Sequence, residues 1–341
     1  MCTAKNSGIT RGLHRAGAPS PGKHFFLSRR SPSTHHERFL TESRCVVETM
    51  ESANTYEQPA GNALRIRPMV ESDLSDALQL LERAGRPHRL RDLTALFEVG
   101  EGVVIQAGDA TVGMGMRWLW GAEEASVGLI AEHPSWREHG VSEQLMNALC
   151  SGLERHAVRM QVTPPLPDWA TRLGFVHVGD IARLEGRAAL PPLVALPDGY
   201  RLRPAGRKDL LLLTQLDTAA TGMTRMKMLQ SWLPNALATM VVDHPDGAQG
   251  FALMRRFGRG AVIGPVIAPC TETAKALIAH LAAMADGRFL RLDVMNAPDL
   301  REWIETIGLE QTGHTALMVK GGLQQRQPQC RCVVLADETL G

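Results

Sequence analysis

An internal repeat constrains this sequence more than any other feature. The segment LRIRP at residues 64–68 recurs as YRLRP at residues 200–204, an offset of 136 residues. Three further matches follow in the same order: Asp73-Leu74 with Asp209-Leu210, Gly128 with Gly264, and WATRLGF at Trp169 with WIETIGL at Trp303. Matches in one consistent order predict two consecutive copies of a single fold. The Pro-rich residues 187–199 join the two copies.

Each copy begins with the pattern of a short strand followed by an amphipathic helix. In the first copy, Leu64 and Ile66 alternate with arginines, which predicts a strand over residues 64–67. Apolar residues then recur at helical spacing, at Leu74, Ala77, Leu78 and Leu81. Acidic residues just before this run suit the positive end of a helix dipole, and Gly85 is expected to end the helix.

Hairpins and a second helix follow in both copies. VVIQ and TVGMGM flank a turn at Gly108-Asp109, and MVV and FALM flank HPDG in the second copy. A buried strand and an amphipathic helix come next, beginning near Gly140 in the first copy. Because strands come in hairpins before the first crossover, we predict a mixed α/β, α+β-like sheet with helices on both faces for each copy. A doubly wound dinucleotide-binding fold does not match this order.

The sequence most suggestive of chemistry is GLIAEHPSWREHGVSEQLM, which begins at Gly128. A buried strand runs through Pro134 into a polar loop and then directly into a helix. Backbone N–H groups at a helix N-terminus point outward together and, with the helix dipole, bind a diphosphate. Gly140 allows a close approach to the backbone. We expect backbone groups to bind the anion, with Arg137 and His139 either pairing with phosphate or bracing the loop.

This stretch resembles the signature of the GNAT acyltransferase superfamily, which is Arg or Gln, two residues, Gly, one residue, then Gly or Ala, between a strand and a helix. Arg137 and Gly140 match, whereas Ser142 is a modest enlargement at the final position. The resemblance implies two tandem GNAT folds and acetyl-CoA as cosubstrate. The residues that it implies for acetyl-CoA binding are Ile130, Ala131, Glu132, Arg137, Glu138, His139, Gly140, Val141 and Ser142.

The second copy lacks this signature. At the offset of 136 residues it reads CTETAKALI from Cys270, without the Arg, the Gly or the small final residue, and Ile278 replaces Ser142. It resembles the degenerate C-terminal domain of tandem GNAT proteins, which shapes the substrate site of the first. The predicted organisation is a disordered extension (1–60), a GNAT domain (61–186), a linker (187–199), a degenerate GNAT-like domain (200–321) and a flexible tail (322–341). Met50 is an alternative start.

The resemblance also implies direct attack of an amine on the thioester. Since an alkylamine of pKa near 10.4 is almost wholly protonated at pH 7, a base or a desolvating pocket is needed. Many GNAT proteins carry a tyrosine acid where this chain has Ala170. Water, the second copy or unaided thiolate departure would replace it, unless the protein is not a catalyst. Glu132 is the candidate base, with a solvent-facing strand residue as the alternative. Trp118, Trp120 and Trp169 line an acceptor pocket or belong to the core.

Composition excludes several other classes. Lysine plus arginine (37) nearly balances aspartate plus glutamate (36), so no basic excess predicts nucleic-acid binding. No apolar run reaches the roughly 20 residues that span a bilayer. The six cysteines are scattered, and Cys330 and Cys332 read as part of a solvated tail, so we assign neither a disulfide framework nor a metal. Walker, HExxH and GxSxG motifs are missing from the sequence.

Together these features predict a cytoplasmic, monomeric N-acetyltransferase that transfers acetyl from acetyl-CoA to a small-molecule primary amine. Two alternatives stay open. One is a protein-amine acetyltransferase. The other is a non-catalytic acyl-CoA-sensing or ligand-binding protein, which the missing tyrosine favours. An open polar cleft beside the reacting centre would support the enzyme, and a plugged cleft would support the binding protein.

Overall fold

The computed structural model describes residues 63–86, 88–285, 287–322 and 329–341. The predicted disordered extension and the alternative start at Met50 lie outside these residues. All described residues fall in one compact unit, residues 45–341. None of the helices in the described part of the chain is long and apolar enough to cross a membrane.

The first copy confirms the predicted order of elements. It comprises β1 (Leu64–Pro68), α2 (Leu74–Arg83), α3 (Leu90–Phe97), β2 (Glu101–Ala107), β3 (Ala110–Leu119), β4 (Glu124–Glu132), α4 (Val141–Cys150), β5 (Ala157–Val162), α5 (Asp168–Arg172) and β6 (Val176–Arg187). Gly85 follows α2 with a φ of +72°, as expected of a helix-ending glycine. Helix α3 was not predicted, because its eight residues are too few for a clear periodic pattern.

The second copy repeats the first element by element. It comprises β7 (Arg201–Pro204), α6 (Leu210–Thr221), α7 (Met226–Trp232), β8 (Ala238–His244), β9 (Gly247–Phe257), β10 (Gly260–Ala268), α8 (Thr271–Ala283), β11 (Phe289–Met295), α9 (Pro298–Thr306) and β12 (Glu310–Lys320). One additional strand, β13 (Arg331–Val334), follows it. The predicted repeat is therefore a repeat of structure as well as of sequence.

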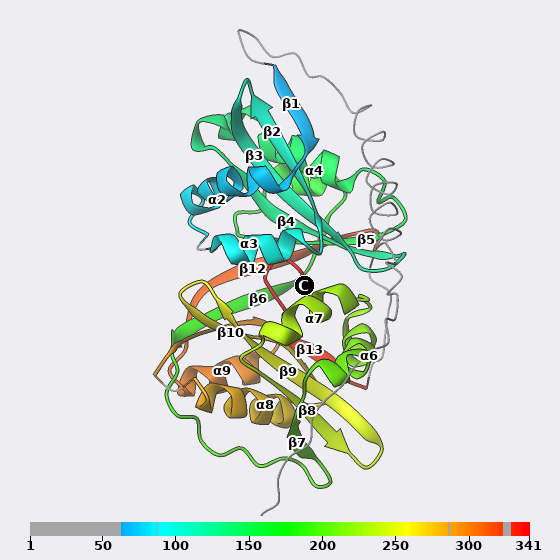
Figure 1. The fold of residues 1–341 in the computed structure, drawn as a ribbon, viewed down its shortest axis with the longest axis vertical. Helices are drawn as coiled ribbons and strands as arrows, with labels where there is room; N and C mark the ends of the chain where they lie inside the picture. Colours follow the sequence, from blue (N-terminus) through cyan, green and yellow to red (C-terminus); the bar gives the residue numbers. More distant parts are fainter. Residues whose placement is uncertain (1–62, 87, 286, 323–328) are drawn as a thin grey trace, which may run out of the picture. The chain divides into compact units, whose positions relative to one another are not determined.

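The thirteen strands form one sheet rather than two separate ones (Figure 1). Their order is β1-β2-β3-β4-β5-β12-β6-β11-β13-β10-β9-β8-β7. The last strand of each copy joins the other copy, because β12 pairs with β5 and β6 pairs with β11, while β6 and β12 pair with each other at the centre. The sheet is mixed, with β4–β5 and β10–β11 as its parallel pairs among the described strands.

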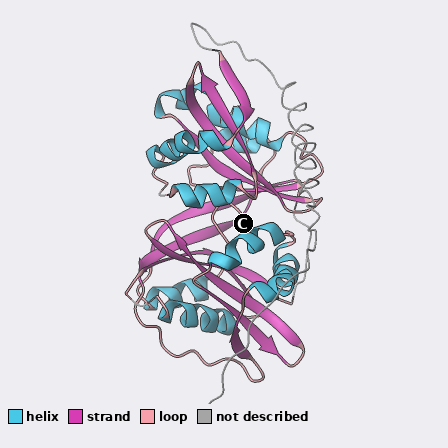
Figure 2. Ribbon diagram, viewed as in Figure 1, coloured by secondary structure: helices cyan, strands magenta, loops and turns pink. Residues whose placement is uncertain are grey.

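Helices cover both faces of this sheet (Figure 2). Strand β2 shows why, since Val103 and Ile105 pack in the core cluster under α4 while Val104 packs in the cluster under α2 and α3. This alternation follows from the two-residue period of a strand. In the second copy α8 covers β8–β10, and α6 and α7 share the cluster of α2 and α3. The two copies therefore have a common core on one face.

The C-terminal segment, residues 329–341, corrects the predicted flexible tail. Strand β13 lies between β10 and β11, and Leu335, Ala336 and Leu340 are buried after it. Cys330 and Cys332 are buried too, and burial raises the pKa of Cys332 to about 12. The sequence did not reveal this strand. The apolar run CVVLA is short, and it forms a strand only because β10 and β11 separate and leave room between them.

Candidate functional site

The loop between β4 and α4 has the form predicted for an anion-binding loop. Residues 133–140 separate the two elements, and most of them form a 3-10 turn over Pro134–His139. Gly140 has a φ of +68°, the left-handed conformation that favours glycine, and a Cβ built there would meet nothing within 4 Å. The side chains of Arg137, Glu138 and His139 are exposed around it. The N-terminus of the ten-residue α4 is therefore accessible from outside.

The N-terminus of α4 already binds a carboxylate. The backbone N–H and the hydroxyl of Ser142 both donate to Oε2 of Glu132, at 3.0 Å and 2.8 Å. Such donors, at the positive end of a helix, also fit a phosphate oxygen. The Glu132 carboxylate thus lies where the anion of a ligand is expected and would have to leave those hydrogen bonds to act as a base. Its predicted base role stays a prediction.

A bulge in β4 opens a cleft in the sheet beside this loop. Met114 pairs with Ala131 and Met116 with Gly128, so Leu129 and Ile130 together face one residue of β3. Leu129 has a φ of +53°, an uncommon conformation for a branched residue. The pairing of β4 with β5 ends at Val127. Beyond the bulge the two parallel strands separate, which leaves the β5-facing edge of β4 free of strand partners in the described sheet.

The C-terminal segment narrows this cleft at the bulge. A small cavity there, of about 30 Å³, is lined by Gly128, Leu129, His88 and residues 337–339. A Cβ on Gly128 would clash with Cγ2 of Thr339. The Ser126 hydroxyl donates to the Leu340 carbonyl at 3.1 Å and holds the segment in place. The cavity has room for about one water molecule, so Thr339 has to move before any larger group reaches the bulge.

Charged groups surround this small cavity. Burial is the largest influence on Asp337 and would raise its pKa, but the combined attraction of Arg255, His88 and Arg291 and a hydrogen bond from the Thr339 backbone lower it overall. Asp337 pairs with Arg255 at 2.7 Å. Burial lowers the pKa of His88, whose Nδ1 is buried without a hydrogen-bond partner in the described part of the chain. Arg291 of β11 pairs with Glu338 at 2.8 Å. Both copies and the C-terminal segment therefore contribute to one polar site.

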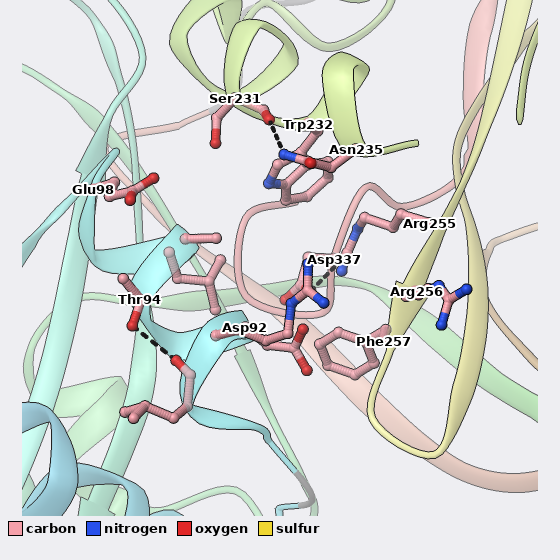
Figure 3. Close-up of a pocket in the computed structure, with 14 residues that line it drawn as sticks. Asp92, Thr94, Glu98, Ser231, Trp232, Asn235, Arg255, Arg256, Phe257 and Asp337 are labelled. Carbon is pink, nitrogen blue, oxygen red and sulfur yellow. Dashed lines mark hydrogen bonds and ion pairs between the residues drawn. The ribbon is translucent and has the colours of Figure 1, made fainter. Parts of the chain in front are cut away.

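A larger pocket of about 670 Å³ adjoins the small cavity (Figure 3). It lies between α3, α7 and β9, and Asp337 and Phe257 line both spaces. The Arg255 guanidinium lies 4.1 Å from the ring centroid of Trp232 and 4.9 Å from that of Phe257. In Figure 3 the side chains of Asp92, Phe257 and Asp337 converge from three separate elements. The pocket is polar, aromatic and large enough for a small molecule.

The second copy has the same bulge but no equivalent loop. The pairing of β10 with β9 shifts register between Ile263 and Val266, beside Gly264. Only Pro269 and Cys270 connect β10 to α8, in place of the eight residues of the first copy. Our alignment of Ile278 with Ser142 is therefore wrong, because Ile278 lies in the third turn of α8 and is buried in its core. The loop is deleted rather than altered.

The three tryptophans considered for the acceptor site do not line the larger pocket. Trp118 and Trp120 are buried, and their indole N–H groups donate to the Leu96 carbonyl and the Ser126 hydroxyl. Trp169 packs against the core cluster under α4. The residues that do line the site, including His88, Trp232 and Asp337, were missed, since no local pattern relates positions so far apart in the chain.

A tandem arrangement of two GNAT folds is the class that this sheet and loop define. Residues 213–331, in the copy without the loop, match the family described as acetyltransferase (GNAT) domain. The uncharacterized N-acetyltransferase YitH of Bacillus subtilis (strain 168) is 25% identical over 229 residues, which cover 66% of this chain and 79% of YitH. These two matches support membership of the GNAT superfamily of acyltransferases.

Solved structures show the same fold. A candidate acetyltransferase from Pyrococcus horikoshii matches with a TM-score of 0.66 and 16% identity, over 85% of this chain and 100% of that one. A tandem GNAT protein from the clavulanic acid biosynthesis pathway matches with a TM-score of 0.51 and 15% identity, over 77% of this chain and 100% of that one. These two matches confirm the predicted fold class, a tandem arrangement of GNAT folds.

Proposed function

We propose that the protein transfers an acetyl group from acetyl-CoA to a primary amine of a small molecule by direct attack, with acetyl-CoA held by the first copy. The observation that carries this proposal is the accessible N-terminus of α4. Its left-handed Gly140 faces open space, and the Ser142 donors already bind an anionic oxygen. A diphosphate offers the same kind of acceptor with more charge.

The remaining parts of the cosubstrate fit the neighbouring residues. The β4 edge at residues 130–132 lies beyond the last pair with β5, so its backbone groups are available to the amides of an extended pantetheine arm. Arg137 and His139 are exposed beside Gly140 and suit phosphate or ribose contacts. The predicted acetyl-CoA residues thus form one continuous path from the helix N-terminus to the bulge.

The larger pocket supplies an acceptor site. It adjoins the bulge through Phe257 and Asp337. Three carboxylates and three arginines line it: Asp92, Glu98, Asp337, Arg91, Arg255 and Arg256. Asp92 and Asp337 already pair with Arg89 and Arg255. Carboxylates attract an ammonium group, while the aromatic wall of Trp232 and Phe257 suits an apolar body. The volume of about 670 Å³ is that of a small-molecule site.

Calorimetric titration of the full chain with acetyl-CoA tests the cosubstrate site. We expect micromolar binding, and a loss of about 100-fold or more in a Gly140→Trp variant, because the side chain is strained there and covers the donors. Cys270→Trp, at the start of the loopless α8, is the matched control and should change the affinity by about twofold at most. No binding by the folded parent protein would reject the proposal.

Turnover is tested with a panel of polyamines, aminoglycosides, arylalkylamines, amino acids and lysine-containing peptides, by release of free thiol. Acetylation of a small amine supports the proposed reaction, whereas acetylation of the peptides alone would assign a protein-amine acetyltransferase. Light scattering of the same sample tests the proposed monomer.

Two observations favour the second candidate function, a non-catalytic acyl-CoA-binding protein. Thr339 lies against Gly128 and reduces the cavity at the bulge to about 30 Å³, and a buried Ala170 stands at the position of the usual tyrosine. Tight acetyl-CoA binding without turnover of any amine in the panel would establish that function instead.

A further inference from the structure

A histidine that the sequence analysis did not consider lies at the junction of the two cavities. His88 follows α2 in the short connection to α3 and lines the small cavity beside Gly128 and Leu129. Its ring packs edge-on against Phe257 at a centroid distance of 5.5 Å. Because Phe257 also lines the larger pocket, His88 stands between the proposed acceptor site and the β4 bulge.

The hydrogen bonding of the His88 ring is incomplete, as is that of His156. The Nδ1 atom of His88 is buried and has no hydrogen-bond partner among the described residues. An unsatisfied buried polar atom destabilises a fold. Such groups occur where a site needs a donor or an acceptor for something other than the protein.

The surroundings of His88 favour its neutral form. Burial is the largest influence and lowers the pKa of the imidazole. Asp337 and a hydrogen bond with the Arg86 backbone oppose this shift, whereas the charges of Arg86 from the same connection and of Arg291 from β11 reinforce it. Glu338 also faces the cavity, where it is paired with Arg291. The charges largely offset one another, so desolvation decides and the imidazole is unprotonated at neutral pH.

We propose that His88 is the general base of the acetyl transfer, a role that rests on the proposed function. As the bond between the amine nitrogen and the carbonyl carbon forms, the nitrogen becomes positively charged and strongly acidic. His88 accepts its proton. The carbon–sulfur bond then breaks with its electron pair on sulfur, and the imidazolium returns the proton to the thiolate directly or through water. No further reactant is needed.

The position of His88 suits this role better than that of Glu132. Glu132 is tied to Ser142 at the N-terminus of α4, where the diphosphate is expected. His88 instead shares its cavity with the bulge, at the end of the cleft where the thioester is expected. It also lies beside the aromatic wall of the larger pocket, through Phe257, from which the amine would approach.

The test compares His88→Gln with a matched control, His156→Gln. His156 also has a buried Nδ1 without a partner but lines none of the cavities described above. With the best amine of the panel, we expect kcat to fall about 10²–10⁴-fold in His88→Gln, with unchanged acetyl-CoA affinity. The fall of kcat/KM at acidic pH, set by a pKa below 6.5 in the parent protein, should disappear. The control should retain parental kinetics.

If His88→Gln folds poorly, two further measurements test the role of His88. His88→Gly should regain activity when imidazole is added, because the freed space adjoins the cavity. NMR titration of the substrate-free full chain should give His88 a pKa below its ordinary value. Parental kcat in folded His88→Gln, or an ordinary His88 pKa, would overturn the role of His88 while leaving the acetyltransferase proposal intact. A parent protein that binds acetyl-CoA but acetylates no amine would overturn both.

Discussion

The two copies share a fold and a bulged central strand, yet their clefts differ. In the first copy, β4 and β5 separate beside an eight-residue loop that leads into α4. In the second copy, β13 fills the space between β10 and β11, and two residues lead directly into α8. The same fold therefore leaves a cleft between β4 and β5 in the first copy, whereas β13 occupies the equivalent space in the second copy.

The C-terminal segment links the two clefts. A Cβ on Gly264 would clash with the Leu335 carbonyl, and a Cβ on Gly128 would clash with the Thr339 side chain. Leu335 and Thr339 are thus only four positions apart in one segment, yet they contact equivalent glycines of the two copies. The difference is that backbone fills the second cleft, whereas a side chain closes the first. Only the closure of the first cleft can be relieved by rotation of a side chain, that of Thr339. Such a closure suits a site that must admit a ligand.

The largest expected effect comes from loosening this segment at its buried end. Leu340 is fully buried in the core cluster shared by both copies. Leu340→Ala should lower the free energy of unfolding by about 2–5 kcal/mol, measured by urea denaturation, because it leaves a cavity. Leu193→Ala, at a fully exposed leucine, is the control. Equal stabilities of Leu340→Ala and Leu193→Ala would contradict the burial of this segment and support the flexible tail that the sequence suggested.

A smaller effect is expected from the two glycines, and it should differ between the copies. Gly264→Ala forces a methyl group against backbone and should destabilise the protein by about 1–3 kcal/mol. Gly128→Ala meets the end of a side chain, so the loss should be less than half as large. Thr339→Ser removes the clashing methyl and should recover most of that loss in the double variant. Equal losses at both glycines, without recovery, would show that the first cleft is closed as rigidly as the second.

The smallest expected effect concerns Glu132. Glu132→Gln removes the charge that occupies the N-terminus of α4, so acetyl-CoA should bind about fivefold more tightly, a gain of about 1 kcal/mol. Glu138→Gln, in the exposed part of the same loop, should change the calorimetric affinity less, because solvent screens its charge. A large loss of kcat in Glu132→Gln, with unchanged affinity, would instead make Glu132 the base.

Local patterns accounted for most of the elements. Alternation at Leu64 and Ile66, helical spacing from Leu74, and the turn at Gly108 each depend on neighbours within a few residues, and each appears in the structure. A buried ion pair shows what such patterns omit. Glu124 is buried in β4, where it pairs with Arg159 at 3.0 Å. Nothing in the residues around Glu124 identifies its partner 35 positions away.

The candidate site was only half predictable. The loop around Gly140 is contiguous, so its signature is visible in one short stretch of sequence. The opposite wall is assembled from His88, Phe257 and Asp337, which come from two copies and a terminal segment. No spacing rule joins these positions, and the strand β13 that brings Asp337 into place was itself not predicted.

The sequence by itself determined that this chain repeats one mixed α/β unit and that the signature at Arg137 and Gly140 occurs only in the first unit, because periodicity and short motifs are local properties of a chain. The tertiary structure alone decided the exchange of β6 and β12, the burial of the C-terminal segment and the place of His88. Those features depend on which surfaces meet after folding, and burial and electrostatics act there between residues that are remote in sequence.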